Sequence, residues 1–382
     1  MRPIRLLGGT YIPDEEFPRE VHIELTARCN LNCAFCYRQS WPGPFEDMDM
    51  SLFRRLVDEL EELGVETVWL SGWGEPLFHP NLEEALDLLE DRFRIGIVSN
   101  GLLLGRYAEK IVEAGVDWVV LSVDSFQRDL YEVLRRGSRL QAVEAGMTKL
   151  DALRRVAGRG GKPAIWVSTI VMRSNYRDLP AHVERASRLG ANGLLLSNLI
   201  PTTEEMAGEA IYFREAPEDL PEVMHRARMR AILTNLRLVE PEFTYKTERS
   251  CPFISNRMLV VSWDGDVVPC LFALHDYYAW IDCREKLIRR ISFGNLRERT
   301  LREIWESPEY VRFRALVRLA QYPSCNDCQF EDSCDFAASN EVDCWGNSPS
   351  CAACPYYRRV VQCPYSGLLE TVRLIREYPE AT

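Results

Sequence analysis

The sequence predicts an α/β protein in which a parallel sheet covered by helices precedes a smaller, cysteine-rich domain. Three observations predict this fold. Short apolar runs alternate with longer amphipathic runs between residues 21 and 200, a pattern typical of repeated βα units. The chain has 382 residues, which is more than one ordinary core accommodates and favours two domains. Ten of its thirteen cysteines follow residue 250, so the second domain is expected to be rich in metal ligands.

The apolar runs have the length of strands, and the amphipathic runs between them have the length of helices. The expected strands are residues 21–26, 66–71, 94–99, 117–123, 164–171 and 193–198. The expected helices are residues 51–63, 81–91, 105–114, 127–136, 141–157 and 178–189. In the first helix Leu52, Leu56, Leu60 and Leu63 recur at helical spacing, and Ser51 is the expected N-cap. Strands that are apolar throughout form parallel sheets, which bind ligands at the carboxyl ends of the strands.

Three cysteines follow the first strand directly, in a loop with the spacing Cys-x3-Cys-x2-Cys. They are Cys29, Cys33 and Cys36. Three thiolates on one loop can bind a single four-iron cubane, because iron–sulfur clusters favour soft thiolate ligands. No further cysteine follows before Cys251, which leaves one iron open to an exchangeable ligand, as in a catalytic zinc site. A zinc knuckle, a disulfide with a spare thiol, or buried unreactive cysteines are the alternatives, although zinc knuckles normally have a second ligand pair downstream.

With Phe35 just before the last cysteine, this loop resembles the signature of the radical S-adenosylmethionine (SAM) superfamily. The resemblance implies a partial (β/α)6 TIM-like barrel and a [4Fe-4S] cluster on Cys29, Cys33 and Cys36 whose open iron binds SAM. It also implies that SAM is cleaved reductively to a 5′-deoxyadenosyl radical, which then attacks a substrate.

Several strand ends carry residues that resemble the SAM contacts of this family. The stretch Ser71–Pro76 resembles the glycine-rich Gly-Gly-Glu-Pro motif, although Trp73 departs from the commonest pattern. The SAM-binding residues implied by the resemblance are Gly72, Trp73, Gly74, Glu75, Ser99, Asn100, Ser122, Asp124, Ser168 and Arg173. Of these, Ser168 and Arg173 are weaker candidates, as is Asn198 on the sixth strand. Each alone is as well explained by a turn or a cap, and only their recurrence at successive strand ends favours a ligand site.

The second domain begins with a predicted hairpin that has Asp264-Gly265 at its tip. The spacing from Cys251 through Gly265 to Cys270, and the later Cys325-x2-Cys328-x5-Cys334, resemble a SPASM domain. That resemblance implies two auxiliary [4Fe-4S] clusters. The first would be bound by Cys251, Cys270 and Cys344, the second by Cys325, Cys328, Cys334 and Cys363, with Cys283, Cys351 and Cys354 as additional candidates.

One position departs from the SPASM pattern. Ala338 stands where a further cysteine usually follows, which leaves the assignment of ligands open. Paired Cys-x2-Cys units also suit zinc.

The tail from residue 343 to 364 is similar to radical SAM/SPASM maturases linked to tungsten-cofactor (tungstopterin) aldehyde oxidoreductases. That similarity favours maturation of a tungsten-containing oxidoreductase or its cofactor. Modification of a peptide or protein side chain is the second expectation. A non-catalytic iron–sulfur or zinc-binding module is the alternative from another class.

The composition of the chain argues against two classes of partner, nucleic acids and membranes. The net charge of −11 argues against nucleic-acid binding, and no apolar run is long enough to span a membrane. The N-terminus has no apolar segment typical of a secretory signal, so we expect a cytoplasmic protein whose cysteines bind metal rather than form disulfides. Ferredoxin or flavodoxin is the implied electron donor.

We expect three parts in the chain. Residues 1–20 form an N-terminal lead-in, residues 21–235 form the radical SAM core, and residues 236–382 form the SPASM-like domain. The stretch 200–250 connects the domains and is expected to contain a helix near 218–234.

Overall fold

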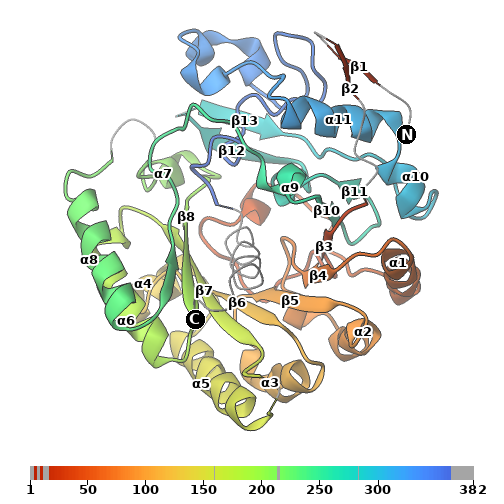
Figure 1. Ribbon diagram of the computed structural model, residues 1–382. Coiled ribbons are helices and arrows are strands. Elements are labelled where there is room, and N and C mark those ends of the chain that lie inside the picture. Colours follow the sequence, from red (N-terminus) through yellow and green to blue (C-terminus); the bar gives the residue numbers. More distant parts are fainter. Residues whose placement is uncertain are drawn as a thin grey trace, which may run out of the picture.

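A nine-stranded sheet forms the centre of the molecule and curves into an open barrel (Figure 1). The computed structural model describes residues 17–158, 160–212, 216–282 and 284–362, and the backbone of residues 4–6 and 9–11. The strand order is β11-β10-β3-β4-β5-β6-β7-β8-β9. All neighbours are parallel except β10 and β11. The nine strands are β3 (Glu20–Ile23), β4 (Thr67–Leu70), β5 (Arg94–Ser99), β6 (Trp118–Ser122), β7 (Ala164–Val171), β8 (Gly193–Asn198), β9 (Arg237–Val239), β10 (Met258–Val261) and β11 (Val267–Val268).

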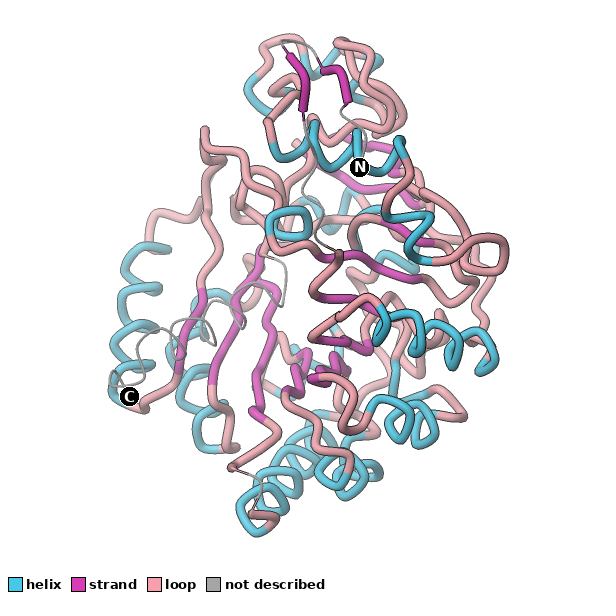
Figure 2. Tube along the Cα trace, turned by 45° about the vertical axis from the view of Figure 1, so that its right-hand side comes forward, coloured by secondary structure: helices cyan, strands magenta, loops and turns pink. Residues whose placement is uncertain are grey.

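Helices cover the outer face of the strands (Figure 2). The helices of the barrel are α1 (Met50–Glu62), α2 (Leu82–Leu89), α3 (Leu104–Glu113), α4 (Arg128–Leu134), α5 (Leu140–Val156), α6 (Leu179–Arg188) and α8 (Leu220–Leu233). The remaining helices are α7 (Glu204–Ala207), α9 (Pro252–Ser255), α10 (Leu301–Trp305) and α11 (Pro308–Arg318). Two hairpins lie outside the central sheet: β1 (Ile4–Leu6) with β2 (Gly9–Tyr11), and β12 (Tyr277–Ile281) with β13 (Arg284–Ile288). Within the described residues, no helix has the length and apolar character that crossing a membrane requires.

The six expected βα units are present, and the α/β fold class is confirmed. Two details differ from the expectation. The first strand ends at Ile23 rather than at residue 26, because the chain from Leu25 onward pairs with residues 46–48 instead of the sheet: the amide of Met48 donates to the carbonyl of Leu25 at 2.7 Å, and the amide of Ala27 donates to that of Glu46 at 2.9 Å. Helix α1 is capped by Asp49, not by Ser51: the Asp49 side chain accepts from the amide of Ser51 at 2.9 Å.

Alternating residues of the strands face two different cores. On the outer face, residues such as Ile23, Leu70 and Ile97 pack against the helices. On the inner face, His22, Trp69, Gly96 and Trp118 lie in register across four neighbouring strands. The Trp69 and Trp118 rings stack at 5.6 Å, and a Cβ on Gly96 would lie 2.2 Å from the Trp69 ring. This end of the barrel is therefore filled by aromatic rings, so any ligand must bind toward the carboxyl ends of the strands.

The C-terminal region adds to the same sheet. The hairpin β10–β11 lies beside β3, with Met258 opposite Glu20 and Val261 opposite Ile23 in parallel register. Gly265 at the tip has a φ of 95°, a conformation that glycine adopts without strain. Because the hairpin extends the barrel, the cysteine-rich region is joined to the core through a shared sheet.

Candidate active site

Cys29, Cys33 and Cys36 line a cavity of about 250 Å³ at the carboxyl ends of the strands. The loop that carries them is held against the end of α4. The amide of Asn32 donates to the carbonyl of Arg136, and the amide of Ala34 donates to that of Leu134, both at 2.9 Å. The loop is therefore fixed by backbone hydrogen bonds to a neighbouring βα unit.

Burial governs the protonation of these thiols. It raises the pKa of Cys29 to about 11 and that of Cys33 to about 12, and it raises the pKa of Cys36 as well. Without metal the three groups are therefore thiols at neutral pH. Because iron binds the thiolate form, loading a cluster must displace these protons.

The donor set fits a four-iron cluster with one open iron. Three soft sulfur donors line the cavity, and among the described residues around it there is no fourth cysteine. In the part of the chain that the structure describes, no three His, Cys, Asp or Glu side chains converge closely enough to hold a single metal ion. A four-iron cubane does not require its ligands to converge on one point, because each thiolate binds a different iron at a different corner of the cluster.

Most residues implied as SAM contacts line the same cavity. They are Gly72, Trp73, Gly74, Glu75, Ser99, Asn100, Ser122, Ser168 and Asn198. Two do not line it. Asp124 is turned away into an ion pair with Arg135, and Arg173 is exposed beyond the end of β7, where its amide donates to the carbonyl of Glu209 at 2.9 Å. The structure thus brings strand ends β4 to β8 together but leaves Arg173 outside the site.

The two glycines of the Gly-Trp-Gly stretch are required by close packing on the chain that follows β3. A Cβ on Gly72 would lie 2.4 Å from the Glu24 side chain, and one on Gly74 would lie 2.0 Å from the carbonyl oxygen of Thr26. Between them, the indole of Trp73 donates to the carbonyl of Leu271 at 3.1 Å. The position that departs from the usual family motif thus contacts the C-terminal region.

Glu75 ties two strand ends together at the floor of the cavity. One carboxylate oxygen accepts from the Ser99 hydroxyl at 2.7 Å and from the amide of Leu77 at 3.0 Å. The other accepts from the amide of Asn100 at 2.7 Å. Burial nevertheless raises the pKa of Glu75 to about 7. Asn100 in turn places its side-chain nitrogen 3.7 Å from the sulfur of Cys29, so the strand-end residues and the cysteine loop form one connected site.

Arg135 also lines the cavity, although nothing in the sequence singles it out. Its Nη1 atom lies 4.0 Å from the sulfur of Cys33, and its guanidinium lies 5.5 Å from the centre of the Phe35 ring. It sits at the C-cap of α4, where a basic residue is ordinary, so its contact with the cysteine loop becomes visible only in three dimensions. Its positive charge lowers the pKa of Cys33, while the charge of Arg38 acts in the same direction on Cys29 and Cys36.

The C-terminal region closes the cavity from the other side. Leu271, Tyr356, Val361 and Gln362 line it together with residues of the barrel. The side chain of Tyr356 is hydrogen-bonded to Tyr37, the residue that follows Cys36. The cysteine loop therefore contacts the C-terminal region directly.

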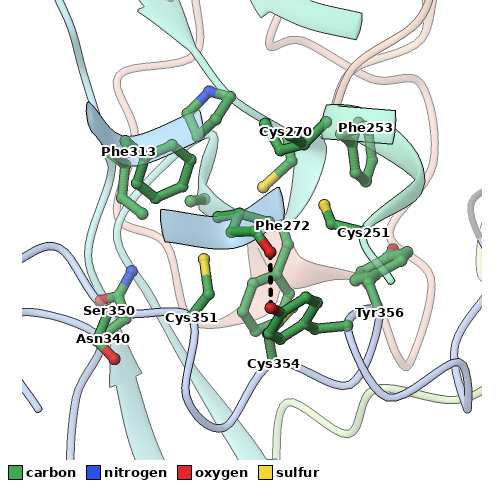
Figure 3. A pocket seen from close by; sticks show the side chains of 16 residues that line it. Cys251, Phe253, Cys270, Phe272, Phe313, Asn340, Ser350, Cys351, Cys354 and Tyr356 are labelled. Carbon is green, nitrogen blue, oxygen red and sulfur yellow. Dashed lines mark hydrogen bonds between the residues drawn. The ribbon is translucent and has the colours of Figure 1, made fainter. Parts of the chain in front are cut away.

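The described cysteines of the C-terminal region fall into two groups. Cys251, Cys270, Cys351 and Cys354 line one enclosed cavity (Figure 3). Cys325 instead has Cys344 and Cys334 as its neighbours, and Cys328 follows it by three residues and is exposed. This grouping differs from the expected one, which placed Cys344 with Cys251 and Cys270. Cys283 and Cys363 lie outside the described residues.

Comparisons with known proteins identify the family of the chain. Residues 23–186 match the radical SAM superfamily, and residues 251–329 match the SPASM iron–sulfur cluster-binding domain. The chain is 37% identical to a "tungsten-containing aldehyde ferredoxin oxidoreductase cofactor-modifying protein" of Pyrococcus furiosus, over 90% of this chain and 96% of that one. It is 24% identical to a PqqA peptide cyclase of Granulibacter bethesdensis, over 89% of this chain and 88% of that one.

Solved structures share the fold at low sequence identity. The structure of Streptococcus suis SuiB bound to S-adenosylmethionine aligns with a TM-score of 0.59 at 16% identity, and the alignment covers 91% of this chain and 78% of that one. From these matches, the chain belongs to the radical SAM superfamily and carries a SPASM domain for iron–sulfur clusters.

Proposed function

We propose that Cys29, Cys33 and Cys36 hold the cluster that binds SAM, and that the radical made there serves the maturation of a tungsten-containing oxidoreductase or its cofactor. The observation that carries the first half is the cavity lined by five strand ends and by three thiols, with no fourth among the described residues around it. Identity of 37% over nearly the whole length of a tungsten cofactor-modifying protein supports the second half.

A bound [4Fe-4S] cluster and SAM supply the chemistry: one electron cleaves the sulfonium to methionine and a 5′-deoxyadenosyl radical. The chain positions and shields this chemistry. Gly72, Trp73 and Gly74 offer backbone groups at the cavity wall, and Ser99, Asn100, Ser122 and Ser168 add polar side chains for the nucleoside and amino-acid parts of SAM. Asp124 acts indirectly in this proposal, by holding Arg135.

The rest of the cavity is suited to excluding water. Phe35, Ile170, Leu199 and Ile200 line it from the barrel, and Tyr356 and Val361 line it from the C-terminal region. A carbon radical abstracts hydrogen from any nearby donor, so an apolar wall protects it until the substrate arrives. The guanidinium of Arg135 places a positive charge beside Cys33, and that charge also acts on Cys36, which offsets part of the repulsion among the thiolates.

Radical SAM enzymes need an electron donor. For this chain we propose ferredoxin or flavodoxin, acting in the cytoplasm. The SPASM domain is proposed to hold two auxiliary [4Fe-4S] clusters, which would take up the electron left after hydrogen abstraction.

A peptide or protein side chain is the second candidate substrate. The likeness to the PqqA peptide cyclase, over 89% of this chain, favours it. The two candidates differ in what the radical must reach: a pterin-type cofactor held by its own enzyme, or an extended peptide.

The SAM-cleaving step is tested with protein purified without oxygen. We expect 5′-deoxyadenosine from SAM and dithionite, and none from Cys29→Ala. Cys328→Ala leaves the three loop cysteines intact and is expected to form 5′-deoxyadenosine while losing substrate turnover. Equal product from wild type and Cys29→Ala would exclude the proposed site.

The tungsten role is tested by producing a tungsten-containing aldehyde oxidoreductase with and without this protein in one host. We expect aldehyde oxidation, and a cofactor of altered mass, only when the active protein is present. Full oxidoreductase activity in cells that have only Cys29→Ala would contradict the tungsten role and favour the peptide alternative.

A further inference from the structure

Four cysteines from three separate segments meet at one enclosed cavity in the C-terminal region. Cys251 precedes α9, Cys270 follows β11, and Cys351 and Cys354 lie near the end of the described chain. In Figure 3 the sulfur atoms of Cys251, Cys270 and Cys351 point toward the middle of the cavity. The remaining wall is mostly apolar, with Phe253, Phe272, Phe313 and Ile291, and has Asn340 and Ser350 on one side.

The four thiols are close enough to affect one another. Burial is the main cause that raises the pKa of Cys351, followed by the charges of Cys354, Cys251 and Cys270. Burial likewise raises the pKa of Cys270, with Cys354 and Cys251 as the next causes. The pKa of Cys251 rises to about 11 and that of Cys354 to about 12, again through burial. The four thiols therefore lie as neighbours around one cavity, as the ligands of a single cluster must.

The backbone around these sulfurs is arranged for thiolates. Cys251 accepts hydrogen bonds from the amides of Phe253 and Ile254. In the same i+2 and i+3 pattern, Cys270 accepts from Phe272 and Ala273. Cys354 accepts from Tyr356 and Tyr357. Amide donors aimed at cysteine sulfur stabilise metal-bound thiolates and tune iron–sulfur clusters.

The other described cysteines have different surroundings. Cys325, Cys328 and Cys334 lie on consecutive short turns, where the amide of Cys328 donates to the carbonyl of Cys325 at 3.0 Å. Arg284 holds this segment by donating to the carbonyl of Cys334 at 2.8 Å. Cys344 lies close enough to Cys325 for its charge to act on that thiol. It does not line the cavity of Cys251 and Cys270.

We propose that Cys251, Cys270, Cys351 and Cys354 bind one four-iron cluster that has no open iron, and that Cys344 completes the second set with Cys325, Cys328 and Cys334. The match to the SPASM domain ends at residue 329, before Cys351 and Cys354, so that match does not assign them. This inference deepens the proposed function, because it specifies the auxiliary clusters.

Four protein ligands, Cys251, Cys270, Cys351 and Cys354, limit what the cluster between them can do. With a protein thiolate on every iron it cannot bind a substrate, and electron transfer is left as its role. Tyr356 lines both this cavity and the cavity of Cys29, Cys33 and Cys36. The fully ligated cluster is therefore the neighbour of the SAM site.

The test counts iron in a background that lacks the SAM cluster, Cys29→Ala/Cys33→Ala/Cys36→Ala, reconstituted without oxygen. Two clusters give roughly eight irons per chain, and a lost cluster removes about four. We expect Cys251→Ala, Cys351→Ala and Cys354→Ala to abolish the same electron paramagnetic resonance signal of the reduced protein. The double variant Cys251→Ala/Cys354→Ala is expected to lose no more iron than either single variant. Cys251→Ala/Cys344→Ala is expected to lose both clusters.

Three results would overturn the assignment: full iron in Cys351→Ala and Cys354→Ala, loss of the same signal in Cys344→Ala and Cys251→Ala, or zinc in place of iron at the four cysteines. Serine variants repeat the series at nearly unchanged side-chain volume, so that a folding defect is distinguished from a lost ligand. Iron content and spectra do not depend on the substrate, so failure of the tungsten role leaves this test intact. The SAM site is tested separately in the single variant Cys29→Ala, which keeps Cys33, Cys36 and all the C-terminal cysteines and is expected to form no 5′-deoxyadenosine.

Discussion

Arg135 and Asp124 form a buried ion pair beside the cysteine loop, with 2.7 Å between Nε and Oδ2. The other oxygen of Asp124 accepts from the amide of Ile170 at 2.9 Å. The pair thus joins α4 to β7 at a point where Arg135 also reaches the sulfur of Cys33. Asp124 therefore positions Arg135, and Arg135 is the residue that faces the cavity.

Arg135→Gln is expected to destabilise the protein by about 3–5 kcal/mol, because it leaves the Asp124 carboxylate buried without its cation. Urea unfolding of the metal-free protein measures this. Asp124→Asn/Arg135→Gln should recover part of the loss, since no charge is then left unpaired. The control is Arg128→Gln, which removes an exposed pair with Glu132 on the same helix and should cost less than about 1 kcal/mol. Equal losses in Arg135→Gln and Arg128→Gln would contradict the argument.

Glu75 should make the stability of the protein depend on pH. Burial raises its pKa from 4.5 to about 7, so the folded state holds a proton that the unfolded state has released. Its contribution to stability is complete below pH 4.5 and is lost as the pH rises through 7. We expect the free energy of unfolding of wild type, relative to Glu75→Gln, to fall by roughly 1 kcal/mol per pH unit in that window. Unfolding of both proteins at pH 4.5, 5.5, 6.5 and 7.5 measures the difference, and parallel curves would refute the assignment.

The barrel was predictable because its units are local. Apolar strands and amphipathic helices alternate along the chain, and the parallel order follows from that alternation. The place of β10 beside β3 was not predictable. The hairpin around Gly265 could be predicted from the sequence, but nothing in its pattern predicts that it pairs with Glu20–Ile23. Pairings this far apart in the chain depend on the packing of everything between them.

The candidate site was likewise predictable from the sequence only where its residues are close together in the chain. Cys29, Cys33 and Cys36 form one short spacing, so the sequence reveals them together. Arg135 was missed because it reaches the cysteine loop across a hundred residues of chain. Cys351 and Cys354 were visible as a pair, but spacing alone does not reveal that they share a cavity with Cys251 and Cys270.

Gly74→Ala should be strongly destabilising. Its Cβ would lie 2.0 Å from the carbonyl oxygen of Thr26 and 2.6 Å from that of Arg28, and backbone atoms cannot rotate away as a side chain can. We expect a loss of about 3 kcal/mol or more, together with loss of SAM-dependent spectral changes of the cluster. In Gly105→Ala, on α3, the nearest atom to the new Cβ is 3.8 Å away. That variant should be neutral or gain up to about 1 kcal/mol from helix propensity. Similar melting temperatures for the two variants would show that the clash at Gly74 is relieved in solution.

Glu24 and His275 should couple the barrel to the C-terminal region. The Glu24 carboxylate lies 2.8 Å from Nε2 of His275 and accepts from the amide of Trp73 at 3.0 Å, and both acidic and imidazole side chains are buried. The His275 ring also stacks on Trp41 at 3.9 Å. His275→Ala leaves Oε2 of Glu24 with only the long hydrogen bond from the amide of Trp263, at 3.5 Å, and removes the stack. We therefore expect the free energy of unfolding to fall by about 2–4 kcal/mol. We also expect the mutation to speed amide hydrogen exchange more in β10 and β11 than in β6.

The matched control for His275→Ala is Arg19→Gln. Arg19 directly precedes β3, the strand that Glu24 follows, and its substitution removes an exposed ion pair with Glu66. It should change stability by less than about 1 kcal/mol and leave exchange in β10 unaltered. His275→Gln can still donate to Glu24 but cannot stack as the imidazole does, so partial recovery relative to His275→Ala would separate the hydrogen bond from the ring contact. If exchange in β10 and β11 is the same in wild type and His275→Ala, the shared strands alone hold the two regions together, and the buried pair contributes nothing to their coupling.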